Sequence, residues 1–577
     1  MLEDLPVHLL YSRYLKSPDE NRIAEQLWGE IPGNMSVAAE LMRRKQKNGQ
    51  PTSTITEDLK KALKNRMKGL GILTEKTITN IDMLNMGAAE TGQQPNLFGG
   101  PSLILNKIVY TTKLSILGEC VPIYFIGDYD GVQNELINGR VPSTSGRGII
   151  FTYPVPKGYE SAPIRTLPNP SESWLYKTLE KLEGNTRSLL KGIDSSKQEK
   201  ILQNLEHIST IIRSAYFSTE NVSDWSSRII GTITNIEANL GVIFFPPSDP
   251  LIRSLFQSGY EDLLGEPNRS KFISASNQAV DKIEAAGYRA QIGKRNQKYV
   301  PFYYECTNDV CHQSRVELQY NKIEGSSDAI LKGKCPICET NYEFSIQINN
   351  PDISDIIKNI SPRVDSRQFV VSSIVNILAH VGGPGETSYY AEVMPGVRAT
   401  GMPFPIYTRY SRVFYNTTWN ESYANILKSR GTPTLSQEKI FTSLAKWVEA
   451  KKKQDFAVIV EAHTEIEACI DDTFSKLELK DAELLLEIEI IKKQLSDSKN
   501  RQILLNDMKK KQIEEGEIDV YLSSAFGRYA PEKYGQETSW LWIDMALISG
   551  VFDIMKSYDR LYGPWTPNSS VFFINFS

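Results

Sequence analysis

The sequence predicts an α/β protein with a parallel sheet at its centre, and two observations lead to this fold class. First, a helical run at 102–117 lies between a segment that passes into Thr91–Pro101 and a strand-like run at Val121–Ile126. Strand, glycine-rich turn, helix, strand and acidic turn is the order of a βαβ unit. Second, apolar strand candidates recur at Leu240–Phe245 and Met402–Tyr407. Ligands of parallel sheets collect at the carboxyl ends of strands, so the turns that follow these strands form the first candidate site.

Composition and charge narrow the class of protein further. The 577 residues are 40% hydrophobic and 23% charged, which fits a folded protein of several domains and excludes a mostly disordered chain. Lys and Arg number 65 and Asp and Glu 69, so the net charge of −4 gives no general attraction for nucleic acid. The acidic start Met1–Pro6 is unlike a signal peptide, and the apolar stretch 540–555 is too short to span a bilayer. We therefore expect a cytoplasmic enzyme with neither a membrane nor a nucleic acid as a partner.

Four of the six cysteines fall in one short window as two close pairs. Four residues separate Cys306 from Cys311, and two separate Cys335 from Cys338. Such pairs are typical of a zinc ribbon, in which two turns donate four thiolates to one tetrahedral ion. Four thiolates leave no open coordination position, so the sequence predicts a structural zinc site. Cys311 is the least secure ligand and His312 is its alternative, while disulfides are the weaker interpretation without a secretion signal.

The segment from Thr434 to Glu515 contains no glycine and no proline. Apolar residues recur there at two heptad positions, interrupted only by Asp481; they are Ile470, Leu477, Leu484 and Ile491, and Phe474, Ile488 and Leu495. This period predicts a coiled coil. The polar run Ser496–Asn500 could turn the chain back to give an antiparallel hairpin. Because such seams need a partner surface, we expect a homodimer; a long helix packed on its own domain is the alternative.

Two glycine-containing turns are candidate binding elements. The first, Thr91–Pro95, lies before a predicted helix, where backbone N–H groups suit an anion and the glutamine amides can bind a carboxylate or a sugar hydroxyl. Gly99 and Gly100 follow it and would allow close approach of a ligand to the backbone. The second turn is 382–385, which Glu386 follows. Neither turn matches a Walker phosphate loop or a dinucleotide fingerprint.

Charged residues beside these turns are candidates for chemistry. Asp128 and Asp130 come directly after a predicted strand, where acidic pairs bind hydroxyls, amines or Mg²⁺, and where they also stabilise turns. Glu386 could accept a proton or hold an ammonium group. Arg363 and Arg367 could point the same way on an extended segment and clamp a carboxylate or phosphate, with an ion-pair network as the equal alternative. His380 adjoins the second turn and is either functional or a core histidine.

Taken together, these motifs resemble the family of bacillithiol-biosynthesis cysteine-adding enzymes (BshC). The first family signature corresponds to Thr91–Pro101 followed by Asn106 and Lys107, and the second corresponds to Val121–Asp130. The remaining elements follow in order and are Gly287 with Tyr288, 381–386 with 389–391, and Gln536 with Glu537. The resemblance covers most of the chain, and its motifs are specific jointly rather than singly.

The resemblance implies a Rossmann-like core related to that of class I aminoacyl-tRNA synthetases, with helical insertions and a coiled coil that pairs two subunits. It implies amide formation between cysteine and the amine of a glucosamine-malate conjugate, with ATP activating the carboxylate and Mg²⁺ as an optional companion. By analogy, Asp128, Asp130 and Glu386 are assigned to catalysis. The residues assigned to substrate and nucleotide binding are Thr91, Gly92, Gln93, Gln94, Gly99, Gly100, Lys107, Arg363, Arg367, Gly383, Gly385 and Tyr389.

The predicted segments alternate between the core and additions to it. They are an N-terminal helical region at 1–80, the first half of the core at 81–170, a helical insertion at 171–235, the core continued at 236–300, the zinc ribbon at 301–348, the second half of the core at 349–430, the coiled coil at 431–515, and a C-terminal segment packing on the core at 516–577.

Two departures from the family pattern leave alternatives open. This chain has Tyr129 where the family has a histidine, and a tyrosine cannot accept a proton near neutral pH. The ribbon lies where the family has a short segment. Another carbon–nitrogen ligase of the same fold, or a non-catalytic zinc and coiled-coil scaffold that binds RNA or protein, are therefore the alternatives. The enzyme interpretation requires that the corners around Gln93 and Pro384 meet across one cleft in the folded chain.

Overall fold

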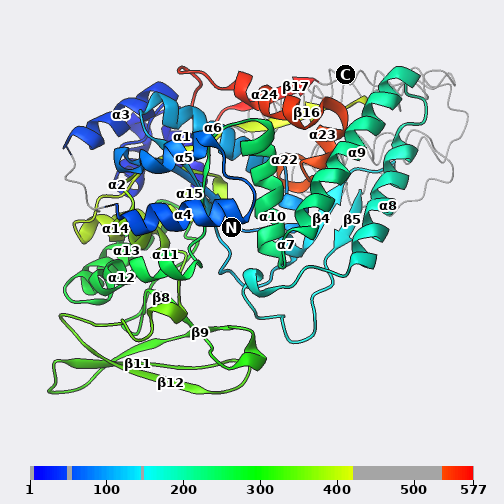
Figure 1. Cartoon of the computed structure of the whole chain (residues 1–577). Coiled ribbons are helices and arrows are strands. Elements are labelled where there is room, and N and C mark those ends of the chain that lie inside the picture. The colour runs from blue at the N-terminus through cyan, green and yellow to red at the C-terminus, as the bar shows by residue number, and fades with distance from the viewer. Residues whose placement is uncertain (1–4, 49–54, 145–147, 420–535, 576–577) are drawn as a thin grey trace, which may run out of the picture.

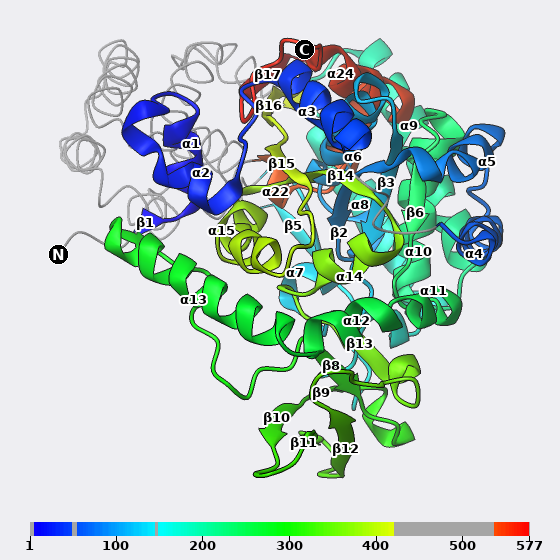
Figure 2. The same cartoon turned by 90° about the vertical axis from the view of Figure 1, so that its left-hand side faces the viewer.

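Five parallel strands form the central sheet of the protein. A computed structural model describes residues 5–48, 55–144, 148–419 and 536–575 (Figures 1 and 2). The sheet has the order β15-β14-β2-β3-β6, and every neighbouring pair of strands is parallel. The strands are β2 (Ala88–Gln93), β3 (Val121–Ile126), β6 (Ile243–Phe245), β14 (Ile377–Gly382) and β15 (Ile406–Arg409).

The strand order identifies where the chain changes direction across the sheet. From β2 the chain moves outward to β3 and then β6, and it later returns to place β14 and β15 on the other side of β2. This is the strand order of a Rossmann-like sheet, so the prediction of an α/β core of this kind is confirmed. The change of direction falls between β2 and β14. The crevice outside the carboxyl ends of these two strands is the expected ligand position in such sheets.

The composition of the strands explains why they lie at the centre. All six residues of β3, Val-Pro-Ile-Tyr-Phe-Ile, are buried, and so are all six of β14. Continuous apolar strands are typical of parallel sheets that are covered on both faces. The crossover from β2 to β3 is α6 (Leu103–Leu117), of which all but three residues are buried. The last strand begins four residues later than the run predicted at Met402–Tyr407, since β15 covers Ile406–Arg409.

Helices before and between the strands surround the sheet (Figure 1). The N-terminal helices are α1 (His8–Tyr14), α2 (Ile23–Trp28), α3 (Met35–Asn48), α4 (Glu57–Gly69) and α5 (Glu75–Asp82). The helical insertion consists of α8 (Glu172–Leu189), α9 (Ser195–Phe217) and α10 (Val222–Gly231). It follows a short helix and an antiparallel pair, which are α7 (Asn134–Ile137), β4 (Asn138–Val141) and β5 (Ile149–Thr152). The helices between β6 and β14 are α11 (Pro250–Leu255), α12 (Gln257–Leu264), α13 (Asn268–Ala285) and α14 (Arg367–Ile374), and α15 (Pro384–Ala399) follows β14.

The segment that contains the four clustered cysteines projects from the helical body (Figures 1 and 2). We call residues 301–348 the cysteine ribbon. It consists of β8 (Phe302–Glu305), β9 (Arg315–Glu317), β10 (Gln319–Lys322), β11 (Asp328–Lys334) and β12 (Asn341–Gln347). Strands β10, β11 and β12 form one antiparallel sheet, while β8 pairs with β9 and with β13 (Ile360–Pro362), which follows the ribbon in the chain.

The described C-terminal residues pack on the core. They form α22 (Gln536–Ser539), α23 (Ile543–Ser549), α24 (Val551–Leu561) and β17 (Val571–Asn575), and β17 pairs with β16 (Arg412–Asn416). Trp540 and Trp542 are fully buried, and Trp542 Nε1 donates a hydrogen bond to the carbonyl of Phe98 at 2.8 Å. The predicted coiled coil at 431–515 lies outside the described residues. Within them, no helix has the length and apolar composition that crossing a membrane requires.

Candidate functional site

The corner that follows β2 and the corner that follows β14 meet at one lysine. Lys107, from α6, donates hydrogen bonds to the carbonyl of Gly92 at 2.7 Å, to Glu386 Oε2 at 2.8 Å and to Gln93 Oε1 at 3.4 Å. Its side chain is only 2% exposed. Thr91 Oγ1 joins the two strands directly by donating to the carbonyl of Val381, 290 positions away, at 2.9 Å. The corners therefore lie together where the sheet changes direction, and a cleft between them stays a prediction.

Local sequence places Glu386 at this junction. Pro384 occupies the first turn of α15, and Glu386 accepts a hydrogen bond from the backbone N–H of Gly383 at 2.6 Å, as in a capping box. Burial acts to raise the pKa of Glu386, but the Lys107 ammonium and His380 outweigh it and lower that pKa to about 2. A carboxylate with so low a pKa is a weak base at neutral pH. Glu386 holds the Lys107 ammonium, which is one of the two roles expected for it, and its low pKa disfavours the other, proton transfer.

A second charged group lies directly beneath the junction. Arg367 donates to the Glu90 carboxylate and to Tyr390 Oη, the latter at 2.7 Å, and its guanidinium stacks 4.4 Å from the centre of the Phe125 ring. Burial acts to raise the pKa of Glu90, while Arg367 and His380 lower it to about 2. His380 is fully buried between Glu90 and Glu386, with nitrogen–oxygen distances of 3.7 and 3.5 Å. It is thus a core histidine that links this buried group to the junction.

Polar side chains continue from Lys107 along the carboxyl ends of β2 and β3. Gln93 Nε2 donates to Gln94 Oε1 at 3.1 Å, and Gln94 Nε2 donates to Asp130 Oδ2 at 3.0 Å. Arg315, from the cysteine ribbon, donates to Asp130 Oδ1 at 3.1 Å. We call Glu386, Lys107, Gln93, Gln94 and Asp130 the strand-end network. It extends from α15 to the edge of the cysteine ribbon.

Asp128 lies beside this network and has a different environment. Its carboxyl is 3% exposed and accepts a hydrogen bond from Ser248 Oγ at 2.7 Å. Burial raises the pKa of Asp128 to about 6, against the lowering effects of Arg165 and Ser248. A carboxyl that titrates near neutrality can accept a proton and release it again, which is the requirement for a general base. Between Asp128 and Glu386, Asp128 is the carboxyl whose pKa suits that task.

The first glycine-containing segment differs from the expected anion-binding turn. Thr91, Gly92 and Gln93 are residues of β2, aligned with Tyr124, Phe125 and Ile126 of β3, so the sheet occupies their backbone groups. The turn itself begins at Gln94. The glutamine side chains thus remain available for recognition, but a cradle of backbone N–H groups at this position was a wrong prediction.

Gly99 and Gly100 do not line the junction either. Both have positive φ values, +80° and +85°, which favour glycine. A Cβ atom at Gly99 would lie 3.0 Å from Ile229 of α10, and one at Gly100 would lie 2.7 Å from Ile104 of α6. These glycines therefore serve tight packing between elements of the chain, and the prediction that they allow approach of a ligand is not supported by their surroundings.

The predicted arginine clamp is absent from the described structure. Residues 363–367 form a turn, because the backbone N–H of Arg367 donates to the carbonyl of Arg363 at 3.0 Å, and the segment is not extended. Arg363 consequently points elsewhere, donating to Glu317 at 3.0 Å and stacking 4.6 Å from the Tyr303 ring centre. The alternative of separate ion pairs is the one observed.

The remaining predicted residues lie around the second corner and the strand end. Gly383 caps α15, while Gly385 has open space where a Cβ would be. Tyr389 packs edge-on against Tyr390 with ring centres 4.7 Å apart, and burial raises its pKa well above the usual value. Tyr129 is also buried, and burial likewise raises its pKa, so this phenol stays protonated at neutral pH. It cannot replace a histidine as a proton acceptor.

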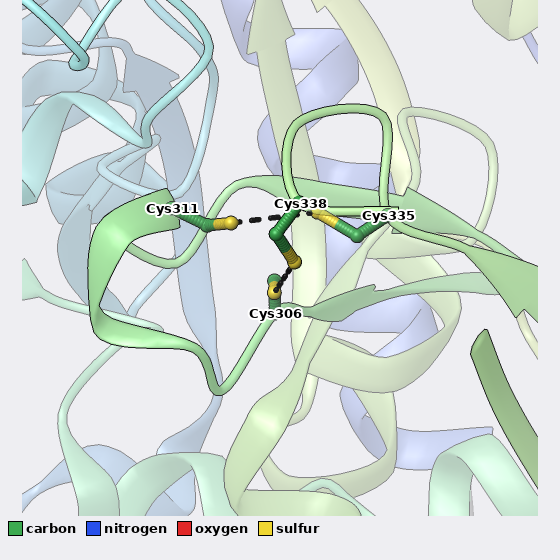
Figure 3. A group of neighbouring side chains, drawn as sticks. All are labelled: Cys306, Cys311, Cys335 and Cys338. Atoms are coloured by element: carbon green, nitrogen blue, oxygen red, sulfur yellow. Dashed lines mark hydrogen bonds between the residues drawn. The ribbon is translucent and has the colours of Figure 1, made fainter. Parts of the chain in front are cut away.

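The four clustered cysteines form a compact group in the ribbon (Figure 3). We call Cys306, Cys311, Cys335 and Cys338 the cysteine cluster. Their sulfur atoms all lie within 4.8 Å of one another, with Cys306 and Cys338 at 3.6 Å and Cys311 and Cys335 at 3.7 Å. They are separate thiols, so the disulfide interpretation is not supported. Sulfur atoms around a tetrahedral zinc ion lie about 3.8 Å apart, given a Zn–S bond of about 2.3 Å. The residues therefore fit a zinc ion.

Two details of the cysteine cluster strengthen that fit. The backbone N–H of Ile337 donates to Cys335 Sγ at 3.4 Å, and Thr340 Oγ1 lies 3.1 Å from Cys338 Sγ. The hydrogen bonds from Thr340 lower the pKa of the Cys338 thiol to about 6, which favours the thiolate that binds a metal. His312 is not part of the group: its ring stacks on Tyr159 with centres 3.7 Å apart. Cys311, the ligand expected to be least secure, supplies the fourth sulfur.

Several polar and charged residues near the site could not have been predicted from the sequence pattern. Glu90 is the exception, since a lone carboxylate in the small-residue strand Ala-Ala-Glu-Thr-Gly-Gln stands out in a buried sheet. The other residues are distant in sequence and unremarkable in pattern; they are Arg165, Ser248, Arg253, Glu305 and Arg315.

The parallel sheet order defines a Rossmann-like α/β protein, and the junction at the change of direction is its candidate ligand site. Residues 10–410 match the family model described as "Bacillithiol biosynthesis BshC, N-terminal Rossmann-like domain". This match covers more than half of the chain, and the chain belongs to the BshC family.

Curated relatives agree with the family match. The chain is 28% identical over 344 residues, 57% of its own length, to the "Putative cysteine ligase BshC" of Desulforamulus reducens, of which it covers 55%. It is 23% identical over 330 residues to the protein of the same name from Natranaerobius thermophilus, of which it covers 53%. The like-named protein of Staphylococcus carnosus is 23% identical over 380 residues and is covered for 63%. The chain thus spans between about half and two thirds of each relative.

Proposed function

We propose that this protein is a ligase that adds L-cysteine to the amine of glucosamine-malate in the biosynthesis of bacillithiol. The observation that carries the proposal is the junction at Lys107, where two corners typical of the family meet at the change of direction of the sheet. We infer the reaction from the family membership, and we infer the position of the active site from the junction.

The proposed reaction has two steps. In the first step an oxygen of the cysteine carboxylate bonds to a phosphorus atom of ATP, and a phosphoanhydride bond of ATP breaks to release ADP or pyrophosphate. In the second step the amine of the acceptor attacks the activated carbonyl carbon, and the phosphorylated group leaves. The amide C–N bond forms, the bond to the leaving group breaks, and the attacking nitrogen loses a proton. Mg²⁺ would enter with the nucleotide as its counter-ion. The amide groups of Gln93 and Gln94 offer donors and acceptors to these substrates at the strand ends.

We assign to Asp128 the role of the general base that accepts the proton from the attacking amine. Its pKa of about 6 makes it ionised at neutral pH and still basic enough to accept the proton of the attacking amine. Glu386 and Lys107 act as positioning residues, because each neutralises the other and together they fix the two corners. Asp130 is held by Gln94 and Arg315 and orients the strand end.

The cysteine cluster is proposed to hold one structural zinc ion. Four thiolates complete the coordination of zinc and leave no position for a substrate, so the ion would fix the two turns of the ribbon and take no part in ligation. Homodimer formation through the coiled coil is also part of the proposal. It rests on the heptad pattern at 470–495 alone.

The test is a direct assay. Purified protein is incubated with ATP, cysteine and glucosamine-malate, and the thiol product is followed by mass spectrometry together with nucleotide turnover. We expect product that depends on all three substrates and that is lost in Lys107→Met. Lys113→Met is the matched control, because Lys113 lies on the same helix but pairs at the surface with Asp559. Absence of product, with no cysteine-dependent ATP turnover in the native protein, would refute the proposal.

A further inference from the structure

A pocket of about 810 Å³ lies between the cysteine ribbon and the core. Pockets that bind small molecules have volumes of about 300–1,000 Å³. One wall comes from the loop that carries Cys306 and Cys311, and the other comes from residues near the ends of β3 and β6. Its lining residues with polar or charged side chains include Arg165, Ser248, Arg253, Glu305, Asn308 and Gln313. We call it the ribbon pocket.

Two arginines give the ribbon pocket a surplus of positive charge. Arg165 and Arg253 both donate to the same buried carboxylate, Glu305, at 2.7 and 2.6 Å. Arg253 also donates to the second oxygen of this carboxylate, Glu305 Oε1, at 3.3 Å. One carboxylate thus serves two guanidinium groups. Counting Lys358 and Asp309 as well, the lining carries one net positive charge.

The arginines also have more donors than the chain supplies acceptors. A guanidinium has five N–H donors. Arg165 Nη1 and Arg253 Nε have no hydrogen-bond partner among the described residues. Arg253 is 5% exposed, so water is a poor substitute there. The pair therefore lacks acceptor atoms for these donors, and a ligand carboxylate supplies them.

The ribbon pocket is connected to the proposed general base. Ser248 lines the pocket and donates to Asp128 Oδ1 at 2.7 Å. The backbone N–H of Arg165, another lining residue, donates to the backbone carbonyl of Asp128 at 3.1 Å. A molecule whose anionic end lies between Arg165 and Arg253 would therefore extend toward the side of the sheet on which Asp128 lies.

We propose that the ribbon pocket binds the carboxylate end of the acceptor molecule, and that Arg165 and Arg253 recognise it. This assignment rests on the function proposed above and adds the position of the acceptor. Charge separates this ligand from the nucleotide. Two guanidinium groups with unpartnered donors suit a small carboxylate. A nucleoside triphosphate carries about four negative charges and would leave most of them unbalanced in a buried site.

The experiment measures binding without turnover. Titration calorimetry of the full, zinc-loaded chain is performed with malate, with inorganic phosphate and with ATP as separate probes. The variants are Arg165→Gln and Ser248→Ala, and the matched control is Arg213→Gln. Arg213 lies on α9, is paired with Glu206 at the surface, and is remote in sequence from the pocket lining. Zinc content and the unfolding midpoint of every variant are measured first, so that a loss of binding is separated from a loss of fold.

We expect malate to bind the native protein and its dissociation constant to rise about tenfold or more in Arg165→Gln, since a charge-assisted hydrogen bond contributes about 1.5–3 kcal/mol. Ser248→Ala, which keeps both arginines, should raise it by a smaller factor, and Arg213→Gln should leave it unchanged. Phosphate binding as tightly as malate, or equal malate affinity in Arg165→Gln and Arg213→Gln, would overturn the assignment.

The two proposals fail in different ways. If malate binding depends on Arg165 but no thiol product forms with ATP and cysteine, the pocket is a carboxylate site, and the proposed function falls together with the identity of the ligand as its acceptor. If product forms while Arg165→Gln leaves the dissociation constant of malate unchanged, the proposed function stands and the pocket assignment falls.

Discussion

The strand-end network and the cysteine cluster are sites built in opposite ways. In the network, Lys107 and Glu386 come from helices that the chain visits far apart, and only the order of the sheet strands brings them within 2.8 Å. In the cluster, four cysteines within a short window reach one another through two turns of a small ribbon. The first site depends on the whole fold, whereas the second needs only its own segment and, in our proposal, a metal ion. A substitution in the network should therefore destabilise the whole fold, whereas one in the cluster should affect the ribbon alone.

The largest effect is expected from Lys107→Met. The substitution leaves Glu386 buried without its counter-charge, which destabilises a folded chain by about 3–5 kcal/mol, and it removes the contact that fixes the two corners. We expect the unfolding midpoint in denaturant to fall and ligase activity to drop about a hundredfold or more.

The double variant Lys107→Met with Glu386→Gln separates these two consequences of losing Lys107. It removes both charges and should recover much of the stability but not the activity. Equal stability of Lys107→Met and the surface control Lys113→Met would show that the junction is not the integrating element described here.

Cys335→Ser should act locally. We expect loss of one zinc ion per chain, measured by elemental analysis, and faster hydrogen exchange in 301–348, because metal binding supplies the folding free energy of such small segments. The strands of the central sheet should keep their protection. The matched control is Cys120→Ser, a single cysteine outside the cluster, which should keep the zinc content of the native chain. Zinc retained at one per chain in Cys335→Ser would refute the assignment of the ligands.

These contrasts explain which parts of the protein could be read from the sequence. The βαβ unit, the apolar strand β3 and the cysteine cluster are local patterns, and residues 121–126 and the four cysteines were placed correctly. The meeting of the two corners was predicted through the family motifs, and the sheet order provides its physical reason.

The wrong predictions concern segments whose local sequence does not decide between a strand and a turn. Thr91 and Gly92 read as a turn because glycine disfavours strands, yet pairing with β3 and β14 overrides that preference. Arg363 and Arg367 read as a clamp because alternation suggests an extended segment, yet a tight turn separates them. Arg165 and Arg253 carried no signal, since only folding brings them to Glu305.

Arg363 and Arg367, which were predicted to form a clamp, allow the stability contributions of an exposed and a buried ion pair to be compared. Arg367→Met removes a buried partner of Glu90 and should destabilise the chain by about 3–5 kcal/mol. Arg363→Gln removes a pair with Glu317, whose side chain is 66% exposed, and should change stability by about 1 kcal/mol or less. Thermal and denaturant unfolding of the two variants measure the difference. Similar losses in both would mean that burial does not distinguish these pairs.

The expected effect of Asp128 on stability is modest, and its sign is opposite to that of the buried pairs. The folded pKa of about 6 lies above the usual value, so the protonated carboxyl favours the folded state, and that stabilisation is lost as the pH rises through 6. Asp128→Asn keeps a neutral side chain of the same shape and should therefore increase stability at pH 7 to 8 by about 1–3 kcal/mol. Activity should fall about a hundredfold or more, because the variant cannot accept the proton. The native enzyme should lose activity below pH 6 with a midpoint near the Asp128 pKa, a dependence that Asp128→Asn removes from any residual rate. The pH profile of activity and the free energy of unfolding of both proteins test this prediction. If Asp128→Asn is less stable than the native protein at pH 8, the Asp128 carboxylate stabilises the fold, and its burial is not a cost that serves proton transfer.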